Sequence, residues 1–110
     1  MAYDEDLAAR VRDCLQQESG LSEKKMFGGL AFLIDGHMAV AASGQGGLLV
    51  RVDPAQTDAL AARPHVDRFV MRGREMNGWL RVDPPAVQTE TDLERWVRIG
   101  VAYVRTLPPK

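Results

Sequence analysis

The chain has 110 residues, of which 45% are hydrophobic and 26% charged, and its formal net charge is −1. These values are typical of one globular domain and exclude a chain that is disordered over most of its length. They also exclude the strong long-range attraction to DNA or anionic membranes that a highly basic protein has.

The sequence favours a cytoplasmic protein. Cys14 is the only cysteine, so an intrachain disulfide and a disulfide-stapled secreted scaffold are excluded. Residues 1–6 are acidic where a signal peptide needs a basic start and an apolar run. No apolar stretch approaches the roughly 20 residues of a membrane span. We therefore expect a single cytoplasmic domain over residues 1–110, with no membrane association.

The first half of the chain predicts a helix followed by four strands. The helix runs from about residue 4 to residue 17, with Asp4 as its cap and apolar residues at helical spacing. Asp35-Gly36 predicts a type I′ hairpin turn, which needs positive φ at both positions. The strands are expected over residues 23–27, 30–34, 37–42 and 48–52.

The second half predicts a short helix, two strands and a long helix. Asp53-Pro54 begins the short helix, which ends near Arg63. Strands are expected over residues 67–71 and 79–82, with 72–78 as a connection too long for a tight turn. The last helix has a capping box at Thr91–Glu94, for which Thr89 is an earlier alternative, and an apolar stripe to Leu107. Hairpin-linked strands with helices on one face predict a two-layer α+β domain with a mostly antiparallel sheet.

No catalytic constellation is recognisable. Cys14 lies on the apolar face of the first helix, which predicts a buried structural thiol. His37 and His65 have no second ligand at metal spacing. The glycine-rich turns are not followed by Gly-Lys-Ser/Thr, so they are not a phosphate-binding loop. We therefore expect no enzyme activity, no catalytic residue, no metal and no cofactor.

Trp79 is the strongest candidate for a partner contact. If Leu80 and Val82 face the core, Trp79 and Arg81 share the opposite face of their strand. Tryptophan and arginine are the residues most enriched in interface hot spots. The alternative is an indole packed under a loop. Arg72 and Arg74, in the basic middle of the chain, complete the candidate partner-binding set.

Several segments resemble the N-terminal domain of the TfoX/Sxy family, bacterial proteins named as regulators of competence for DNA transformation. The likeness is carried by residues 23–32, 49–52, 73–79 and 107–110, and the start Met1–Asp4 also looks like stand-alone members. It implies an α+β fold like that of type III secretion chaperones, with no known catalytic residue or cofactor. In the full-length regulators the domain is joined to a C-terminal helical domain and works with a transcription activator, and we expect that second domain to be absent here.

Two functions therefore compete. The first is a non-catalytic protein-interaction or regulatory module linked to transcription regulation, whose partner is another protein or a second copy in a homodimer. The second is direct nucleic-acid binding through a basic patch on the middle strands. Lys24, Lys25 and Arg51 supply its cations together with the arginines named above. The slightly acidic chain favours the first function, as does the fact that a single tryptophan and no interleaved aromatic residues accompany these arginines.

Overall fold

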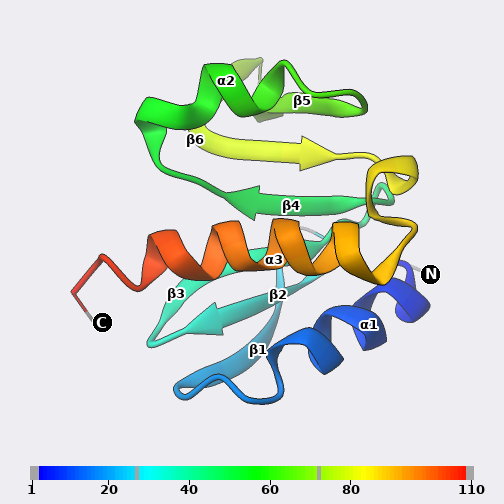
Figure 1. The fold of residues 1–110 in the computed structure, drawn as a ribbon, viewed down its shortest axis with the longest axis vertical. Coiled ribbons are helices and arrows are strands. Elements are labelled where there is room, and N and C mark those ends of the chain that lie inside the picture. Colours follow the sequence, from blue (N-terminus) through cyan, green and yellow to red (C-terminus); the bar gives the residue numbers. More distant parts are fainter. Residues whose placement is uncertain (1–2, 27, 72, 109–110) are drawn as a thin grey trace.

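The computed structural model describes residues 3–26, 28–71 and 73–108, and within them a six-stranded antiparallel sheet carries three α-helices (Figure 1). The α+β class is therefore confirmed. The helices are α1 (Glu5–Leu15), α2 (Thr57–Ala61) and α3 (Glu90–Val104). The strands are β1 (Leu21–Met26), β2 (Gly29–Ile34), β3 (His37–Ala42), β4 (Leu48–Arg51), β5 (Val66–Met71) and β6 (Arg74–Val82). Short 3₁₀ turns, Pro54–Gln56 and Pro84–Val87, precede α2 and α3.

Local signals place most of the element ends. The Asp4 carboxylate accepts a hydrogen bond from the backbone N–H of Leu7, as expected for a helix cap. Asp35 and Gly36 both have positive φ, 51° and 87°, so the predicted turn between β2 and β3 is confirmed. Thr89 caps α3 through the backbone N–H of Asp92, so the earlier of the two proposed caps is the one used.

Three sequence predictions need correction. The long connection expected over residues 72–78 is wrong, because β6 already begins at Arg74 and pairs there with Met71. After a register shift between Arg68 and Val70, the two strands of this hairpin pair again at Glu75 and Arg74, on the N-terminal side of Trp79. The first helix ends at Leu15, two residues early, and the short helix begins as a 3₁₀ turn. Phe27, the expected end of the first strand, lies outside the described residues.

The sheet order is β1-β2-β3-β4-β6-β5, so the β5–β6 hairpin attaches through β6 to β4. The pairing between β3 and β4 is short and joins only residues 40–42 to residues 48–50. Beyond Val50 the two strands are therefore no longer paired. The first residues of β3 and the last residue of β4 lie on either side of this opening.

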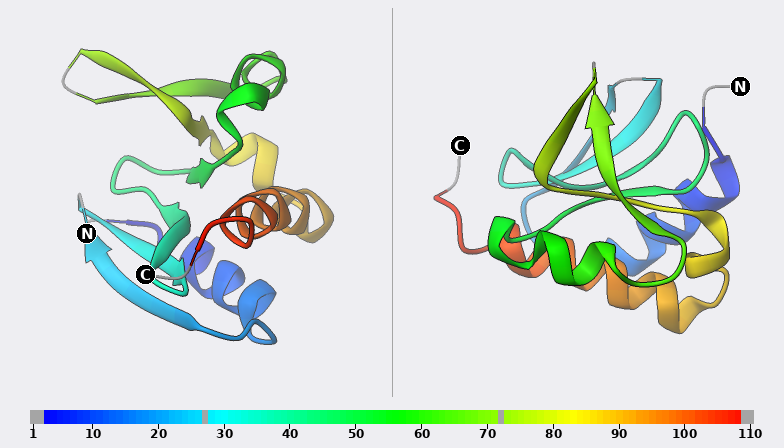
Figure 2. Two further views of the ribbon diagram at one scale, coloured as in Figure 1. Left: turned by 90° about the vertical axis from the view of Figure 1, so that its left-hand side faces the viewer. Right: turned by 90° about the horizontal axis from the view of Figure 1, so that it is seen from above.

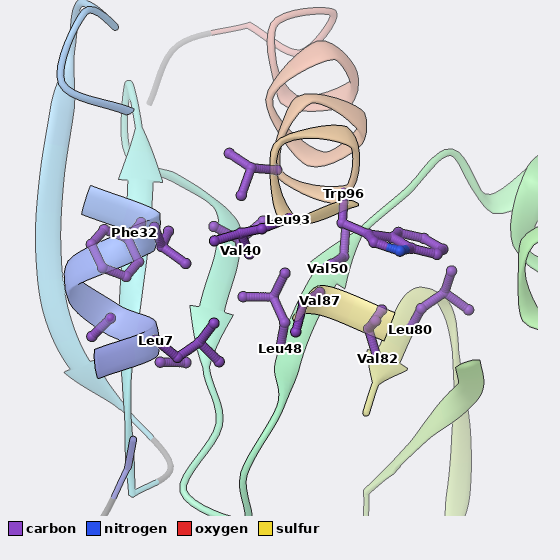
Figure 3. Packing of buried hydrophobic residues seen from close by; sticks show 14 of the residues in the cluster. Leu7, Phe32, Val40, Leu48, Val50, Leu80, Val82, Val87, Leu93 and Trp96 are labelled. Carbon is purple, nitrogen blue, oxygen red and sulfur yellow. The ribbon is translucent and has the colours of Figure 1, made fainter. Parts of the chain in front are cut away.

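All three helices contribute to the layer on one face of the sheet, and the core lies between that layer and the strands (Figures 2 and 3). Phe32, Val40, Val50 and Leu80 point into it from four different strands and are fully buried. Leu93 and Trp96 of α3 meet them from the helix side. Alternation along β6 thus points Leu80 and Val82 into the core, as expected, and leaves Trp79 and Arg81 on the other face.

Gly100 explains how α3 comes so close to the sheet. A Cβ atom at this position would lie 2.6 Å from the Ala39 carbonyl oxygen and 3.1 Å from the Val40 side chain. The helix backbone therefore rests directly on β3. A glycine inside the apolar stripe of α3 makes this close approach possible.

Across residues 3–26, 28–71 and 73–108, no helix combines the length and apolarity that crossing a bilayer requires.

Replacing Gly100 by alanine should destabilise the domain by about 1–3 kcal/mol, because the added methyl group pushes α3 away from β3. Helix propensity alone predicts the opposite sign, a gain of about 1 kcal/mol. Urea unfolding of Gly100→Ala measures the outcome. Ala102→Gly, at an exposed position of the same helix, is the matched control and should lose only the propensity difference. A stabilised Gly100→Ala would show that α3 does not rest on the sheet at this point.

Candidate functional site

The face of the sheet opposite the helices, called the open face below, carries a second apolar cluster. Strand register places one row of side chains across all six strands of this face. The row consists of Lys24, Ala31, Ala41, Leu49, Arg81 and Asp67. Its apolar centre is buried beneath longer side chains from neighbouring rows, which are only partly buried: Met26, Leu33, Met38 and Phe69. The described members of this cluster all come from strands, so the cover over its centre is made of strand side chains.

Curvature turns the open face into a groove. The β5–β6 hairpin and strands β1–β3 both extend away from the helices, and the sheet is concave between them (Figure 2). The hollow has a volume of about 490 Å³. Met26 and Met38 line one side, Leu49 forms part of the floor, and Phe69 and Val70 form the other side. Val70 is 54% exposed, which makes it the one large hydrophobic residue in the described part of the chain that is strongly exposed.

Arg81 lies at the polar end of this groove, but its guanidinium is already engaged. It donates to Ser43 Oγ at 3.3 Å and to the Gln45 carbonyl oxygen at 3.1 Å. Its Nε lies 3.4 Å from a carboxylate oxygen of Asp83. Arg81 therefore holds the loop that ends the groove, and its charge is partly neutralised. Arg68, on the hairpin side, is likewise paired with Asp58 and Glu75.

Trp79 forms a cluster with two residues from other elements. The guanidinium carbon of Arg51 lies 5.5 Å from the centroid of the Trp79 ring and 5.6 Å from that of Tyr103. Arg51 and Trp79 are directly paired across β4 and β6 on the open face. Tyr103 reaches them from α3, where β3 and β4 have separated. All three side chains are half-buried, and Trp79 belongs to none of the core clusters.

The structure does not bring the other predicted cations together. Lys24 and Lys25 are exposed on the edge strand β1, where alternation directs them to opposite faces of the sheet. Arg74 is exposed at the far end of the β5–β6 hairpin. Arg72 lies outside the described residues. Among the predicted residues that the structure describes, Arg51 and Trp79, which came from the two competing sets, lie together.

The residues considered for catalysis have structural surroundings. The sequence predicts a buried Cys14, but the side chain is only half-buried. This partial burial raises the pKa of the thiol, which disfavours the reactive thiolate. His37 Nε2–H donates to the Pro108 carbonyl oxygen at 2.6 Å, which ties down the end of the chain. His65 is exposed in a turn with φ of 63°. Within the described ranges, no three potential ligands gather to hold a metal ion.

Two further residues with shifted pKa values, Arg12 and Glu23, form a structural ion pair on the helix side of the sheet. Two hydrogen bonds from the Arg12 guanidinium, at 2.7 and 2.8 Å, lower the pKa of Glu23. The same pairing raises the pKa of Arg12. The pair connects α1 to β1 and lies away from the groove.

Sequence reasoning missed two parts of the site. The groove unites β1, β3 and β5, whose common hollow depends on sheet curvature and not on any local motif. Tyr103 was not singled out, although it lies outside the apolar stripe of α3. Its place outside the stripe indicates a ring that does not point into the centre of the core.

The family model described as TfoX N-terminal domain matches residues 13–103. No curated protein matches the chain, and no solved structure matches it. Because the family model spans most of the sequence, the chain belongs to the TfoX N-terminal domain family.

Phe69 and Phe32 provide a direct test that the groove is separate from the core. Phe32→Ala should cost about 3–5 kcal/mol, as for a fully buried ring. Phe69→Ala should cost only about 1 kcal/mol, because its ring is already partly exposed. Urea unfolding of both variants measures the difference, and the loss of an aromatic residue from a strand is common to both. Equal losses would place Phe69 in the core and remove one wall of the groove.

Proposed function

We propose that this TfoX N-terminal domain is a non-catalytic protein-interaction module that binds an apolar segment of a partner protein in the groove of its open face. The observation that carries the proposal is the hollow lined by Met26, Met38, Leu49, Phe69 and Val70 on a face that the three helices leave uncovered. Apolar surface that stays accessible in a folded domain is characteristic of an interaction site.

The chemistry of the lining supports a peptide-like occupant. A volume of about 490 Å³ accommodates a few side chains. Methionine side chains adapt their shape to different apolar partners. Arg51 and Trp79 lie one register step of two residues beyond the lining residues Leu49 and Arg81 on the same face, and their residue types contribute most to interface energy. Since the cations that line the groove already contact carboxylates, the burial of apolar surface is the main driving force available there.

The arrangement of cations favours this function over nucleic-acid binding. Tracking a phosphate backbone requires several cations along one surface. Lys24 and Lys25 diverge from each other, Arg74 is at the hairpin end, and Arg81 is engaged with Asp83. No side of the groove carries a continuous row of free cations among the described residues.

Two groove variants test the proposal. Peptides that bind the wild-type domain are selected from a random displayed library and resynthesised. Val70→Asp puts a charge at an exposed groove position, so it should preserve the fold while weakening the selected peptides about tenfold or more. Trp79→Ala should also weaken them and shift the thermal midpoint by only a few degrees. Isothermal titration calorimetry and thermal unfolding measure both effects.

Arg98→Ala is the control, because Arg98 is exposed on α3, on the other side of the molecule from the groove. It should leave affinity for the peptides unchanged. Unchanged affinity in both groove variants would contradict the proposal, and a large drop in the thermal midpoint of Trp79→Ala would make that residue structural. Saturable binding to duplex DNA with a log–log salt slope of about −0.9 per phosphate contact, lost in Lys24→Ala/Arg74→Ala, would instead favour a nucleic-acid interface.

A further inference from the structure

We propose that Arg51, held against Trp79 and Tyr103, recognises a carboxylate on the segment that binds in the groove, so that the partner segment is both apolar and acidic. This inference rests on the proposed function and adds the chemistry of the partner. Its starting point is that Arg51 differs from most other arginines of the chain.

Most described arginines have a carboxylate partner within the domain. Ion pairs are formed by Arg10, Arg12, Arg68, Arg81, Arg95, Arg98 and Arg105. Arg51 forms no ion pair and no side-chain hydrogen bond with any other residue of the described ranges. It is nevertheless half-buried and in contact with two aromatic rings. A guanidinium that is partly removed from water gains most from an anion, because its N–H groups then recover the hydrogen bonds that they have lost.

The two rings also determine how Arg51 can bind. An aromatic ring within about 6 Å attracts a guanidinium electrostatically without taking up the five N–H donors on the guanidinium edge, which stay available to other partners. The rings restrict the movement of the side chain, so little further ordering is needed when an anion arrives. A planar edge of this kind matches the two oxygens of a carboxylate.

Register connects this edge to the groove. Arg51 follows Leu49 by two residues on the same face of β4, and Trp79 precedes Arg81 by two residues on β6. Two residues along a strand span about 7 Å. A segment whose apolar side chains fill the groove therefore reaches Arg51 with an acidic side chain one or two residues further along.

A carboxylate fits this site better than a chain of phosphates. Arg51 is a single cation, and neither Lys24 nor Arg74 shares its part of the sheet. One bidentate pair suffices for one carboxylate, whereas nucleic-acid affinity accumulates over several phosphate contacts. The uncompensated charge therefore favours an acidic residue of a protein partner.

The test uses two probes that differ only in charge, N-acetyl-leucyl-phenylalanine and its C-terminal amide. Each is titrated into the isotope-labelled domain while NMR follows the Arg51 Nε–H, the Trp79 indole N–H and the methyl groups of Met26 and Met38. The acid should bind about fivefold or more tightly than the amide and should shift the Arg51 signal. Arg51→Gln should abolish this preference while the methionine methyl groups still respond. Arg98→Gln, which removes an exposed arginine outside the site, should preserve it.

Each outcome separates the inference from the proposed function. Equal affinity for acid and amide in the wild type, or a preference that survives in Arg51→Gln, would overturn the inference while methionine shifts still support the groove. An Arg51 response to the acid without methionine shifts would support carboxylate recognition and contradict the groove as the site of apolar binding. No response to either probe would overturn both. A stronger Arg51 response to a single-stranded oligonucleotide than to the acid would replace the carboxylate by phosphate.

Discussion

The contact between α3 and the sheet is the constraint on which the rest of the structure depends. Gly100 lets the helix backbone rest on the carbonyl of Ala39, and the apolar stripe around it packs against β3 and β4. With α1 and α2 beside it, α3 covers one face of the six strands. No described helix remains to cover the other face, so that face is left to its own side chains and to the curvature of the sheet. The position of the candidate site follows from this one-sided arrangement.

The two faces of the sheet therefore differ in how fully their apolar side chains are covered. On the helix side, Phe32, Val40 and Leu80 are fully buried between two layers. On the open side, Ala31 and Ala41 are buried only because longer side chains from β1, β3 and β5 lean over them. Such a cover is sufficient to shield small residues but leaves its own apolar atoms in contact with water. A fold selected for stability alone would gain by burying these atoms, and their exposure is consistent with a partner that buries them instead.

The sequence was informative where structure is determined locally and much less so elsewhere. Helix caps, the Asp35-Gly36 turn and the alternation that separates Leu80 from Trp79 each depend on a few neighbouring residues, and all were predictable. The early start of β6 depends on a register shift in its pairing with β5, where the step from Arg68 to Val70 is matched by the longer step from Leu80 to Glu75. Pairing between β4 and β6, and the curvature that faces Phe69 toward Met38, depend on residues far apart in the chain. The groove could not be anticipated for the same reason.

The charged residues also differ between their positions in the sequence and their neighbours in the fold. Arginines crowd residues 63–81, which suggests a basic patch when the sequence is considered alone. In the fold, carboxylates neutralise two of them: Asp58 and Glu75 pair with Arg68, and Asp83 pairs with Arg81. Arg51 lies outside that run, yet its half-buried charge has no such partner among the described residues. In our proposal, what distinguishes Arg51 is therefore a half-buried charge held between two aromatic rings and left uncompensated, rather than a local excess of cations.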